Sequence, residues 1–306
     1  MARHFLSIDD VSPEELNLLL ESAAKIKQSP ADHASRLQGR SVALIFEKPS
    51  TRTRVSFEVA VASMGGHPLA LSSTELQLGR GETIEDTGRV MSRYVDAIVL
   101  RTFGHDRLES LAGASTVPVV NSLSDYEHPC QTLADLLTVV ERFGEAKGRI
   151  MAYFGDGNNV AHSLLIGCAK LGMHVRVATP AGFEPIPQVV RRATEIAGET
   201  GGSVEITNEP MAAAEDADIL YTDVWASMGQ EQEHAERVLV FTPYRIDAAA
   251  LERAKDDAIV MHCLPAHRGE EITDEVIDGP HSVVWDQAEN RLHTQKALLA
   301  WLLQAE

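Results

Sequence analysis

The sequence predicts an α/β fold of two domains, each a mainly parallel sheet flanked by helices. Short apolar runs typical of buried strands alternate with longer stretches of helical periodicity along the chain. Polar residues end several of these runs, and open α/β sheets bind ligands at the carboxyl ends of their strands. At 306 residues, the chain is long for a single hydrophobic core and has the length expected of two domains of ordinary size. We therefore expect an active site in a cleft between the domains.

The first half begins with a capping box, Ser12-Pro13-Glu14-Glu15, which opens a helix that ends near Lys27. An apolar strand follows at 41–46 and is stopped by Pro49. The next helix, capped by Ser50 or Thr51, ends near Gly65. The other elements expected in this half are strands at 67–71, 97–101 and 117–121 and helices at 83–94 and 128–143.

Residues 144–148 contain two glycines and mark the boundary between the domains. The first domain takes 1–143 and a C-terminal helix at about 288–306, and the second takes 148–287. That helix, clearest over 291–303, is apolar enough to pack on another domain. The strands expected in the second domain are 150–154, 175–178, 219–223, 258–262 and 282–285.

Composition excludes several classes of protein. The net charge of −18 argues against nucleic-acid binding, which normally needs a basic face. No apolar run is long enough for a bilayer, and the N-terminus lacks the apolar core of a signal peptide. The three cysteines are scattered and fit neither a disulfide framework nor a metal site. We expect a cytoplasmic protein with no membrane or nucleic-acid partner.

The first candidate site is the strand-to-helix junction at 50–54, which reads Ser50-Thr51-Arg52-Thr53-Arg54. Free backbone N–H groups, hydroxyls and two guanidinium groups gather there at one helix N-terminus. A phosphate dianion needs this combination, because the helix dipole and the donors point the same way. A merely capped helix with exposed arginines is the alternative interpretation.

A glycine loop, Gly155-Asp156-Gly157-Asn158-Asn159, raises the possibility of a dinucleotide site. Val160 replaces the third glycine of that motif, and the next strand ends at Pro180 without the acid that holds a ribose. We therefore favour a tight turn with Asn159 as a polar helix cap over nicotinamide binding. Asn159 could still face a ligand from this helix N-terminus.

Three strands end in reactive or charged side chains. Arg101, Asp223 and the pair His262-Cys263 occupy these ends, and they come from both halves of the chain. One charged strand end is unremarkable, whereas three indicate a cleft. His128 and Gln131 stand one turn apart at a helix start and can share one face. Taken alone, His128 could instead be a structural histidine whose hydrogen bonds are made at the end of the helix.

Several motifs carry a family resemblance. The stretch 46–54, Phe-Glu-Lys-Pro-Ser-Thr-Arg-Thr-Arg, resembles the carbamoyl phosphate signature of the aspartate and ornithine carbamoyltransferases. The stretches 128–131 (His-Pro-Cys-Gln), 223–229 (Asp-Val-Trp-Ala-Ser-Met-Gly) and 262–265 (His-Cys-Leu-Pro) also match in family order. Aspartate enzymes have a lysine in the mobile loop, but residues 72–81 contain none. The ornithine branch is therefore the better match.

The resemblance implies a set of site residues. It assigns catalysis to Arg101, His128 and Cys263. It assigns ornithine binding to Asn159, Asp223, Ser227 and Met228. The implied contacts of carbamoyl phosphate are Ser50, Thr51, Arg52, Thr53, Gln77, Arg101, His128, Gln131, Cys263, Leu264 and Arg291.

The implied reaction transfers the carbamoyl group of carbamoyl phosphate to the side-chain amine of L-ornithine, giving L-citrulline and phosphate. Carbamoyl phosphate is an acyl phosphate with a good leaving group, so neither a metal nor a cofactor is expected. Gln77 matches a loop residue that reaches the neighbouring subunit's phosphate site, which implies a homotrimer with shared active sites. The single unadorned chain favours arginine biosynthesis.

Two alternatives remain open from the sequence. A carbamoyltransferase for another amine, such as putrescine or an acylated ornithine, is disfavoured because Asp223 with Ser-Met-Gly suits a free α-ammonium and carboxylate. A non-catalytic, anion-binding regulatory protein of the same fold is disfavoured because a binder would not need Arg101, His128, Gln131 and Cys263 together.

Overall fold

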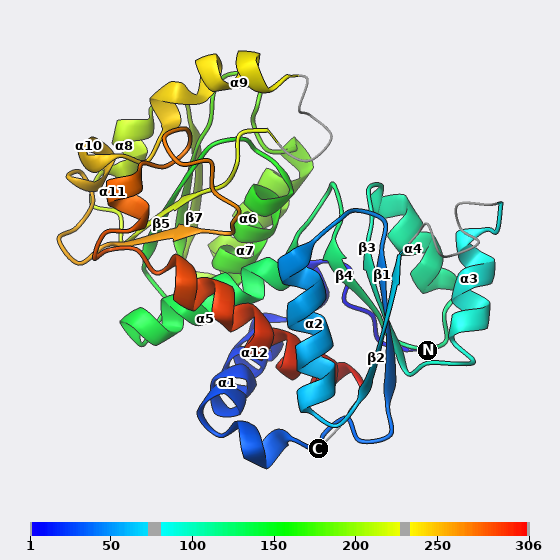
Figure 1. The fold of residues 1–306 in the computed structure, drawn as a ribbon. Coiled ribbons are helices and arrows are strands. Elements are labelled where there is room, and N and C mark those ends of the chain that lie inside the picture. The colour runs from blue at the N-terminus through cyan, green and yellow to red at the C-terminus, as the bar shows by residue number, and fades with distance from the viewer. Residues whose placement is uncertain (1, 73–80, 227–232, 305–306) are drawn as a thin grey trace. The chain divides into compact units, whose positions relative to one another are not determined.

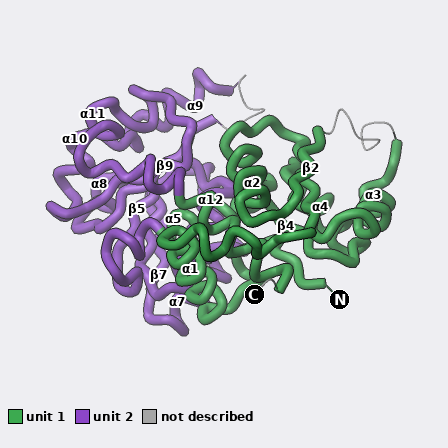
Figure 2. The backbone as a smooth tube through the Cα atoms, turned by 60° about the horizontal axis from the view of Figure 1, so that its bottom comes forward, with its two compact units in different colours: residues 1–137, 290–306 green, residues 138–289 purple. Residues whose placement is uncertain are grey.

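The computed structural model describes residues 2–72, 81–226 and 233–304, and the chain divides into two compact units (Figure 2). Unit 1 contains Met1–Leu137 and Asn290–Glu306, and unit 2 contains Thr138–Glu289. The division falls within helices α5 (Pro129–Phe143) and α12 (Val284–Leu302). Within the described residues, no helix is both long and apolar enough to cross a membrane.

Unit 1 is built on a parallel sheet of strand order β2-β1-β3-β4. Helices α3 and α4 cover one face, where a buried aliphatic cluster lies between them and the strands. Helix α2 lies on the opposite face (Figure 1). The bounds are β1 Ser41–Phe46, β2 His67–Ser72, β3 Ala97–Arg101, β4 Val119–Leu123, η1 Ile8–Asp10, α1 Pro13–Gln28, η2 Pro30–His33, α2 Thr51–Ser63, α3 Ile84–Met91 and α4 His105–Ala114.

Unit 2 contains a second parallel sheet, of order β7-β6-β5-β8-β9. Helices α6 and α7 cover one face and α8, α10 and α11 the other (Figure 1). The bounds are β5 Ile150–Phe154, β6 His174–Ala178, β7 Ser203–Thr207, β8 Ile219–Thr222, β9 Ile259–His262, α6 Asn159–Lys170, α7 Pro187–Thr200, α8 Pro210–Ala214, α9 His234–Phe241, η4 Thr242–Tyr244, α10 Ala248–Leu251 and α11 Asp274–Ile277.

Each sheet has a point where the chain reverses its direction across the strands. In unit 1 this point lies between β1 and β3, and in unit 2 between β5 and β8. Loops on either side of such a point leave the sheet in opposite directions and open a crevice at the carboxyl ends. The α/β fold with two mainly parallel sheets is thus confirmed. Among the described site residues, Arg101 ends β3, and Ser50, Asn159 and Asp223 follow β1, β5 and β8.

One predicted strand is wrong. Residues 282–285 form only an isolated bridge, between Ser282 and Val260, and α12 already begins at Val284. The two valines favour a strand by propensity, but Val284 is fully buried in the unit 2 core, whereas Trp285 is 59% exposed. Packing of one helical face therefore overrides local preference. Strand β7 was not predicted, although Ser203–Thr207 alternates polar and apolar residues.

Candidate active site

In unit 1 the junction between β1 and α2 forms a helix N-terminus rich in donors. Ser50 is the N-cap in an extended conformation, and its Oγ accepts a hydrogen bond from the Thr53 N–H at 3.3 Å. Thr51 and Arg52 are exposed, whereas Thr53 is fully buried. The Thr53 hydroxyl oxygen accepts a hydrogen bond from Arg291 Nη2 at 2.5 Å, so α12 supplies a guanidinium group to this junction.

Arg101 ends β3 directly beside this junction. It is the parallel partner of Phe46 at the end of β1, and its carbonyl accepts a hydrogen bond from the Glu47 N–H at 2.8 Å. The side chain is only 8% exposed. A buried guanidinium group at the switch point thus adds positive charge at the carboxyl end of the sheet, beside the α2 N-terminus.

His128 and Gln131 are buried at the start of α5. Burial, reinforced by the positive charges of Arg291 and Arg101, holds the pKa of His128 well below its ordinary value of 6.5. At neutral pH the imidazole is therefore uncharged and can donate one N–H. Gln131 Nε2 donates to Asp135 Oδ1 at 2.8 Å, and its Oε1 has no hydrogen-bond partner among the described residues.

Two further residues of unit 1, Glu47 and Lys48, fix the loop that leads into α2. The Glu47 carboxylate accepts hydrogen bonds from Arg107 Nη2, at 2.6 Å, and from the Thr102 hydroxyl. Lys48 is buried; its Nζ pairs with Asp125 at 2.5 Å. Sequence reasoning gave them no role, although two opposite charges just before a proline at a strand end were a signal.

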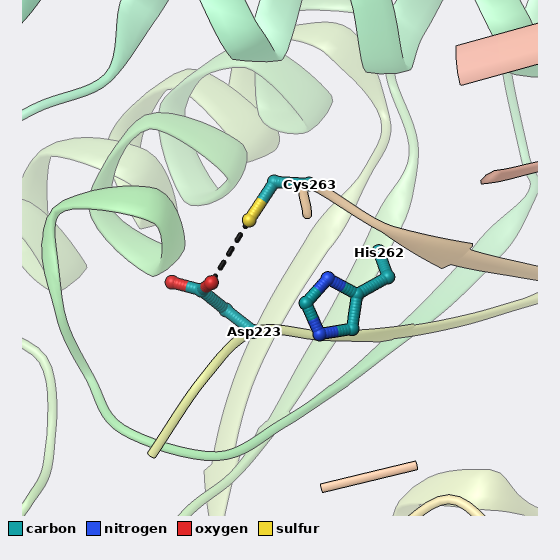
Figure 3. Close-up of side chains that lie close together, drawn as sticks. All are labelled: Asp223, His262 and Cys263. Carbon is teal, nitrogen blue, oxygen red and sulfur yellow. Dashed lines mark hydrogen bonds between the residues drawn. The ribbon is translucent and has the colours of Figure 1, made fainter. Parts of the chain in front are cut away.

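In unit 2 an acid and a thiol meet at the ends of β8 and β9. Figure 3 shows the Cys263 sulfur directed at the Asp223 carboxylate, and Sγ donates to Oδ1 over 2.9 Å. Both residues are buried. Asn158 Nδ2 donates to the other oxygen of Asp223 at 3.0 Å, so both carboxylate oxygens accept hydrogen bonds.

The helix after the glycine loop is capped by Asn158, so the expectation that Asn159 is the cap is wrong. Asn158 Oδ1 accepts hydrogen bonds from the N–H groups of Val160, at 2.9 Å, and Ala161, at 3.2 Å. Asn159 is the first residue of α6 instead. Because neighbouring asparagines have equal capping preference, the sequence alone could not choose between them.

His262 orients the backbone that follows β9. Its Nδ1 accepts a hydrogen bond from the Leu264 N–H at 2.8 Å, so the ring proton lies on Nε2, which donates to Glu271 at 3.1 Å. The side chains of His262 and Glu271 are fully buried. Leu264 adopts a φ of +59°, a conformation that an unsupported leucine avoids. The hydrogen bond from the Leu264 N–H to His262 thus stabilises the unfavourable backbone conformation of Leu264, next to Cys263.

Arg237 of α9 braces the segment after β8. Its Nε donates to the Trp225 carbonyl at 2.6 Å, and its Nη2 pairs with the Asp156 carboxylate. Burial raises the pKa of Asp156 even though Arg237 opposes the shift. This buried ion pair was missed by sequence reasoning, because no local pattern links residues 81 positions apart. It ties the loop after β5 to the stretch that carries Asp223.

The predicted site residues are divided between the two units, and three of them fall in the gaps of the described ranges. Gln77, Ser227 and Met228 lie outside the described residues. Of the predicted contacts of carbamoyl phosphate, Cys263 and Leu264 belong to unit 2 and the others that are described belong to unit 1. Asp223, His262 and Cys263 are close enough to be considered as a metal site, because each has a potential ligand atom within 4.8 Å of the others. Both nitrogens of His262 already make hydrogen bonds, however, so neither is available to a metal ion in this arrangement.

The two units hold chemically complementary groups. Unit 1 gathers a helix N-terminus, hydroxyls and guanidinium groups, which suit an anion with a polarisable carbonyl. Unit 2 offers a buried carboxylate hydrogen-bonded to a thiol, which suits an amine. Group transfer from a phosphorylated donor to an amine requires these two kinds of group.

Two family models match the chain. The carbamoyl-P binding domain of aspartate/ornithine carbamoyltransferases matches residues 3–141, and the Asp/Orn binding domain matches residues 147–302. The chain therefore belongs to the aspartate/ornithine carbamoyltransferase family.

Individual relatives point to one branch of the family. The chain is 60% identical to an ornithine carbamoyltransferase of Acidothermus cellulolyticus over 305 residues, covering 100% of this chain and 98% of the relative. It is 55% identical to an anabolic ornithine carbamoyltransferase of Pyrococcus furiosus, covering 98% and 96%. A solved ornithine carbamoyltransferase from Pyrococcus furiosus superimposes with a TM-score of 0.96 at 54% identity, covering 100% and 98%.

Proposed function

We propose that this chain transfers the carbamoyl group of carbamoyl phosphate to the side-chain amine of L-ornithine, giving L-citrulline and phosphate. The observation that carries the proposal is the 60% identity with an ornithine carbamoyltransferase over the whole chain. The hydrogen-bonded pair of Asp223, which follows β8 at the switch point of unit 2, and Cys263 suits an amine and supports the same conclusion.

Carbamoyl phosphate binds through unit 1 in this proposal. The phosphate oxygens accept hydrogen bonds at the α2 N-terminus, where the exposed Arg52 adds a charge-assisted bond. The buried Arg101 contributes a second guanidinium group from the neighbouring strand. The phosphate contacts are assigned to Ser50, Thr51, Arg52, Thr53 and Arg101, with Gln77 from a neighbouring subunit.

The carbamoyl group is polarised by hydrogen-bond donors. Thr53, Arg101 and His128 donate to its carbonyl oxygen as negative charge develops there. The low pKa of His128 supports a neutral N–H donor rather than a general acid. Gln131 Oε1, which has no hydrogen-bond partner among the described residues, accepts from the carbamoyl NH2, as does the Leu264 carbonyl. Arg291 lies beside this set through its bond to Thr53.

The nucleophile must first lose a proton. An alkylammonium group has a pKa of about 10.4, so free ornithine is almost wholly protonated at neutral pH. The proton passes to the Asp223–Cys263 pair, and the neutral nitrogen then forms a bond to the carbamoyl carbon. The bond from that carbon to the phosphate oxygen breaks, and phosphate leaves with the electron pair. That the substrates meet in a cleft between the domains stays a prediction of the sequence.

The α-amino-acid end of ornithine is assigned to Asn159, Asp223, Ser227 and the Met228 backbone. A competition assay tests this assignment against the rival amines. Initial rates are measured with carbamoyl phosphate and ornithine, putrescine, N-acetylornithine or aspartate at equal concentrations. Ornithine should give by far the highest kcat/KM. A higher value for putrescine or N-acetylornithine would reject a site built for a free α-ammonium and carboxylate.

The proposal also assigns each substrate to a domain, and the protein to a compartment and a pathway. Carbamoyl phosphate binding belongs to residues 1–143 with about 288–306, and ornithine binding to 148–287. The protein works in the cytoplasm, and the anabolic name of the Pyrococcus furiosus relative supports a role in arginine biosynthesis.

We also assign a homotrimer in which Gln77 completes the neighbouring subunit's site. Multi-angle light scattering should give three times the chain mass, and a fully active monomer would remove this assignment. Mixing Gln77→Ala and Arg52→Ala chains after dissociation should restore part of the activity, because some sites then receive both intact residues. Arg52→Ala chains mixed with Arg52→Ala chains are the control.

A further inference from the structure

A tight turn after the β9 loop brings His267 and Glu270 to the same side of the chain. The Glu270 N–H donates to the His267 carbonyl at 2.9 Å, and Gly269 at the third position has a φ of +85°. This is the pattern of a type II turn, which requires glycine or asparagine there. The Arg268 guanidinium is held by Asp274 and Asp278.

A third side chain reaches the same place from a different element. His234 is the first residue of α9, and its Nε2 lies 3.0 Å from Glu270 Oε2. His267 Nδ1 lies 3.6 Å from the same oxygen. The three ligand atoms all lie within 4.8 Å of one another. The side chains of His234, His267 and Glu270 are 38%, 43% and 31% exposed, so an ion can reach them from solvent.

These separations fit the coordination shell of a small transition-metal ion. Zinc binds imidazole nitrogen and carboxylate oxygen at about 2.0–2.2 Å in a tetrahedron, which sets neighbouring ligand atoms about 3.4 Å apart. The two distances to Glu270 Oε2, 3.0 and 3.6 Å, bracket this value, and the ligand atoms of the two histidines lie within 4.8 Å of each other. Two imidazoles and one carboxylate favour zinc, cobalt or nickel over magnesium and calcium, which prefer oxygen ligands.

We propose that His234, His267 and Glu270 bind one divalent transition-metal ion of the zinc class, with water in the fourth position. The ion clamps the start of α9 to the turn that follows β9. This site takes no part in carbamoyl transfer and is distinct from the Asp223, His262 and Cys263 cluster. The alternative is a glutamate that bridges two histidines without metal, and such exposed pairs contribute little to stability.

The test uses Co²⁺ as a visible probe on the tag-free, full-length chain after dialysis against a chelator. A site of two histidines and a carboxylate gives weak visible bands without a sulfur-to-cobalt charge-transfer band in the near ultraviolet. Cobalt bound at Cys263 would give that intense band. We expect one Co²⁺ per chain with visible bands only, and calorimetry should show one Zn²⁺ competing for the site.

Variants localise the ion. His234→Gln with His267→Gln should abolish the visible bands, and Glu270→Gln, which preserves size, should weaken binding without disturbing the fold. His67→Gln is the matched control, because His67 is exposed and belongs to neither cluster. Zn²⁺ should raise the Tm of wild type and of the control but leave the Tm of the double variant unchanged, because ligands that bind only the folded state stabilise it.

Three results would overturn the proposal. One is the absence of any stoichiometric Co²⁺ or Zn²⁺ binding by wild type. The second is a set of visible bands and a Tm rise that persist in the double variant. The third is a spectrum dominated by the sulfur charge-transfer band, which would assign the ion to Cys263.

Discussion

At the scale of single residues, the central feature is the hydrogen bond from the Cys263 thiol to the Asp223 carboxylate. The thiol donates to one carboxylate oxygen over 2.9 Å, and Asn158 Nδ2 donates to the other. In the proposed reaction, the ornithine ammonium meets this pair in a desolvated place, where the charged amine is less stable than in water.

The first prediction separates chemistry from packing at Cys263. Cys263→Ser should cut kcat far more than it lowers the Tm, because a hydroxyl has nearly the same size but is a much poorer proton acceptor. The rate should also rise with pH where bound ornithine loses its proton, and the substitution should alter that profile. Steady-state kinetics from acidic to alkaline pH, with thermal unfolding, measure both effects.

Cys168→Ser is the matched control for this experiment. Cys168 is fully buried in α6, and its sulfur contacts Met151. Its replacement should lower the Tm while leaving kcat and the pH profile unchanged. If Cys263→Ser behaves in the same way, Cys263 is a core thiol and the proton goes to Asp223 or solvent.

The second prediction concerns Arg52, which is exposed at the α2 N-terminus. Arg52→Ala should abolish carbamoyl phosphate binding while the fold survives, because each charge-assisted hydrogen bond contributes roughly 1.5–3 kcal/mol. Calorimetry with a non-hydrolysable phosphonate analogue measures the affinity. Arg89→Ala removes another exposed guanidinium of unit 1, paired with Asp86, and should bind normally. Wild-type affinity in Arg52→Ala would refute the phosphate assignment.

At the scale of elements, two serine helix caps make the same kind of hydrogen bond but have different expected roles, one structural and one also in binding phosphate. Ser12 caps α1 and Ser50 caps α2, each by accepting a backbone N–H three residues later. Ser12→Ala and Ser50→Ala should each lower the free energy of unfolding by about 1 kcal/mol. Only Ser50→Ala should also raise the KM for carbamoyl phosphate. Equal KM values in the two variants would mean that the Ser50 hydroxyl is structural alone.

Most elements could be predicted because their signals are local. The capping box at Ser12 starts α1 as expected, and the strands 41–46, 97–101 and 150–154 have their predicted bounds. Strand ends also identified Asp223 and Cys263, which the structure joins by a hydrogen bond. Apolar runs and caps are short-range patterns, so the sequence displays them directly.

The sequence-based predictions were wrong or incomplete where contacts between residues far apart in the chain determine the structure. The run at 282–285 has strand propensity, yet burial of Val284 in the unit 2 core selects a helix. The edge strand β7 carries alternate polar residues and lacks the apolar run that marks a central strand. The supporting pairs Arg237–Asp156 and His262–Glu271 join residues that no sequence motif links.

At the scale of the whole molecule, several histidines have pKa values below their ordinary 6.5, with burial as the main cause. These residues are His4, His33, His105 and His128. As the pH falls below about 6.5, the unfolded chain therefore binds more protons than the folded chain. The free energy of unfolding should decrease over this range, as urea titrations at several pH values will measure. A stability that rises as the pH falls would contradict this inference.

The most direct test of carbamoyl transfer follows the carbonyl carbon itself. The protein, dialysed against a chelator, is mixed with ornithine and carbamoyl phosphate whose carbonyl carbon carries an isotopic label, and nuclear magnetic resonance follows the label. We expect the label to enter the ureido carbon of citrulline, with one phosphate released per citrulline and no added metal. Label that leaves carbamoyl phosphate only as its hydrolysis products, at the rate seen without protein, would contradict the account.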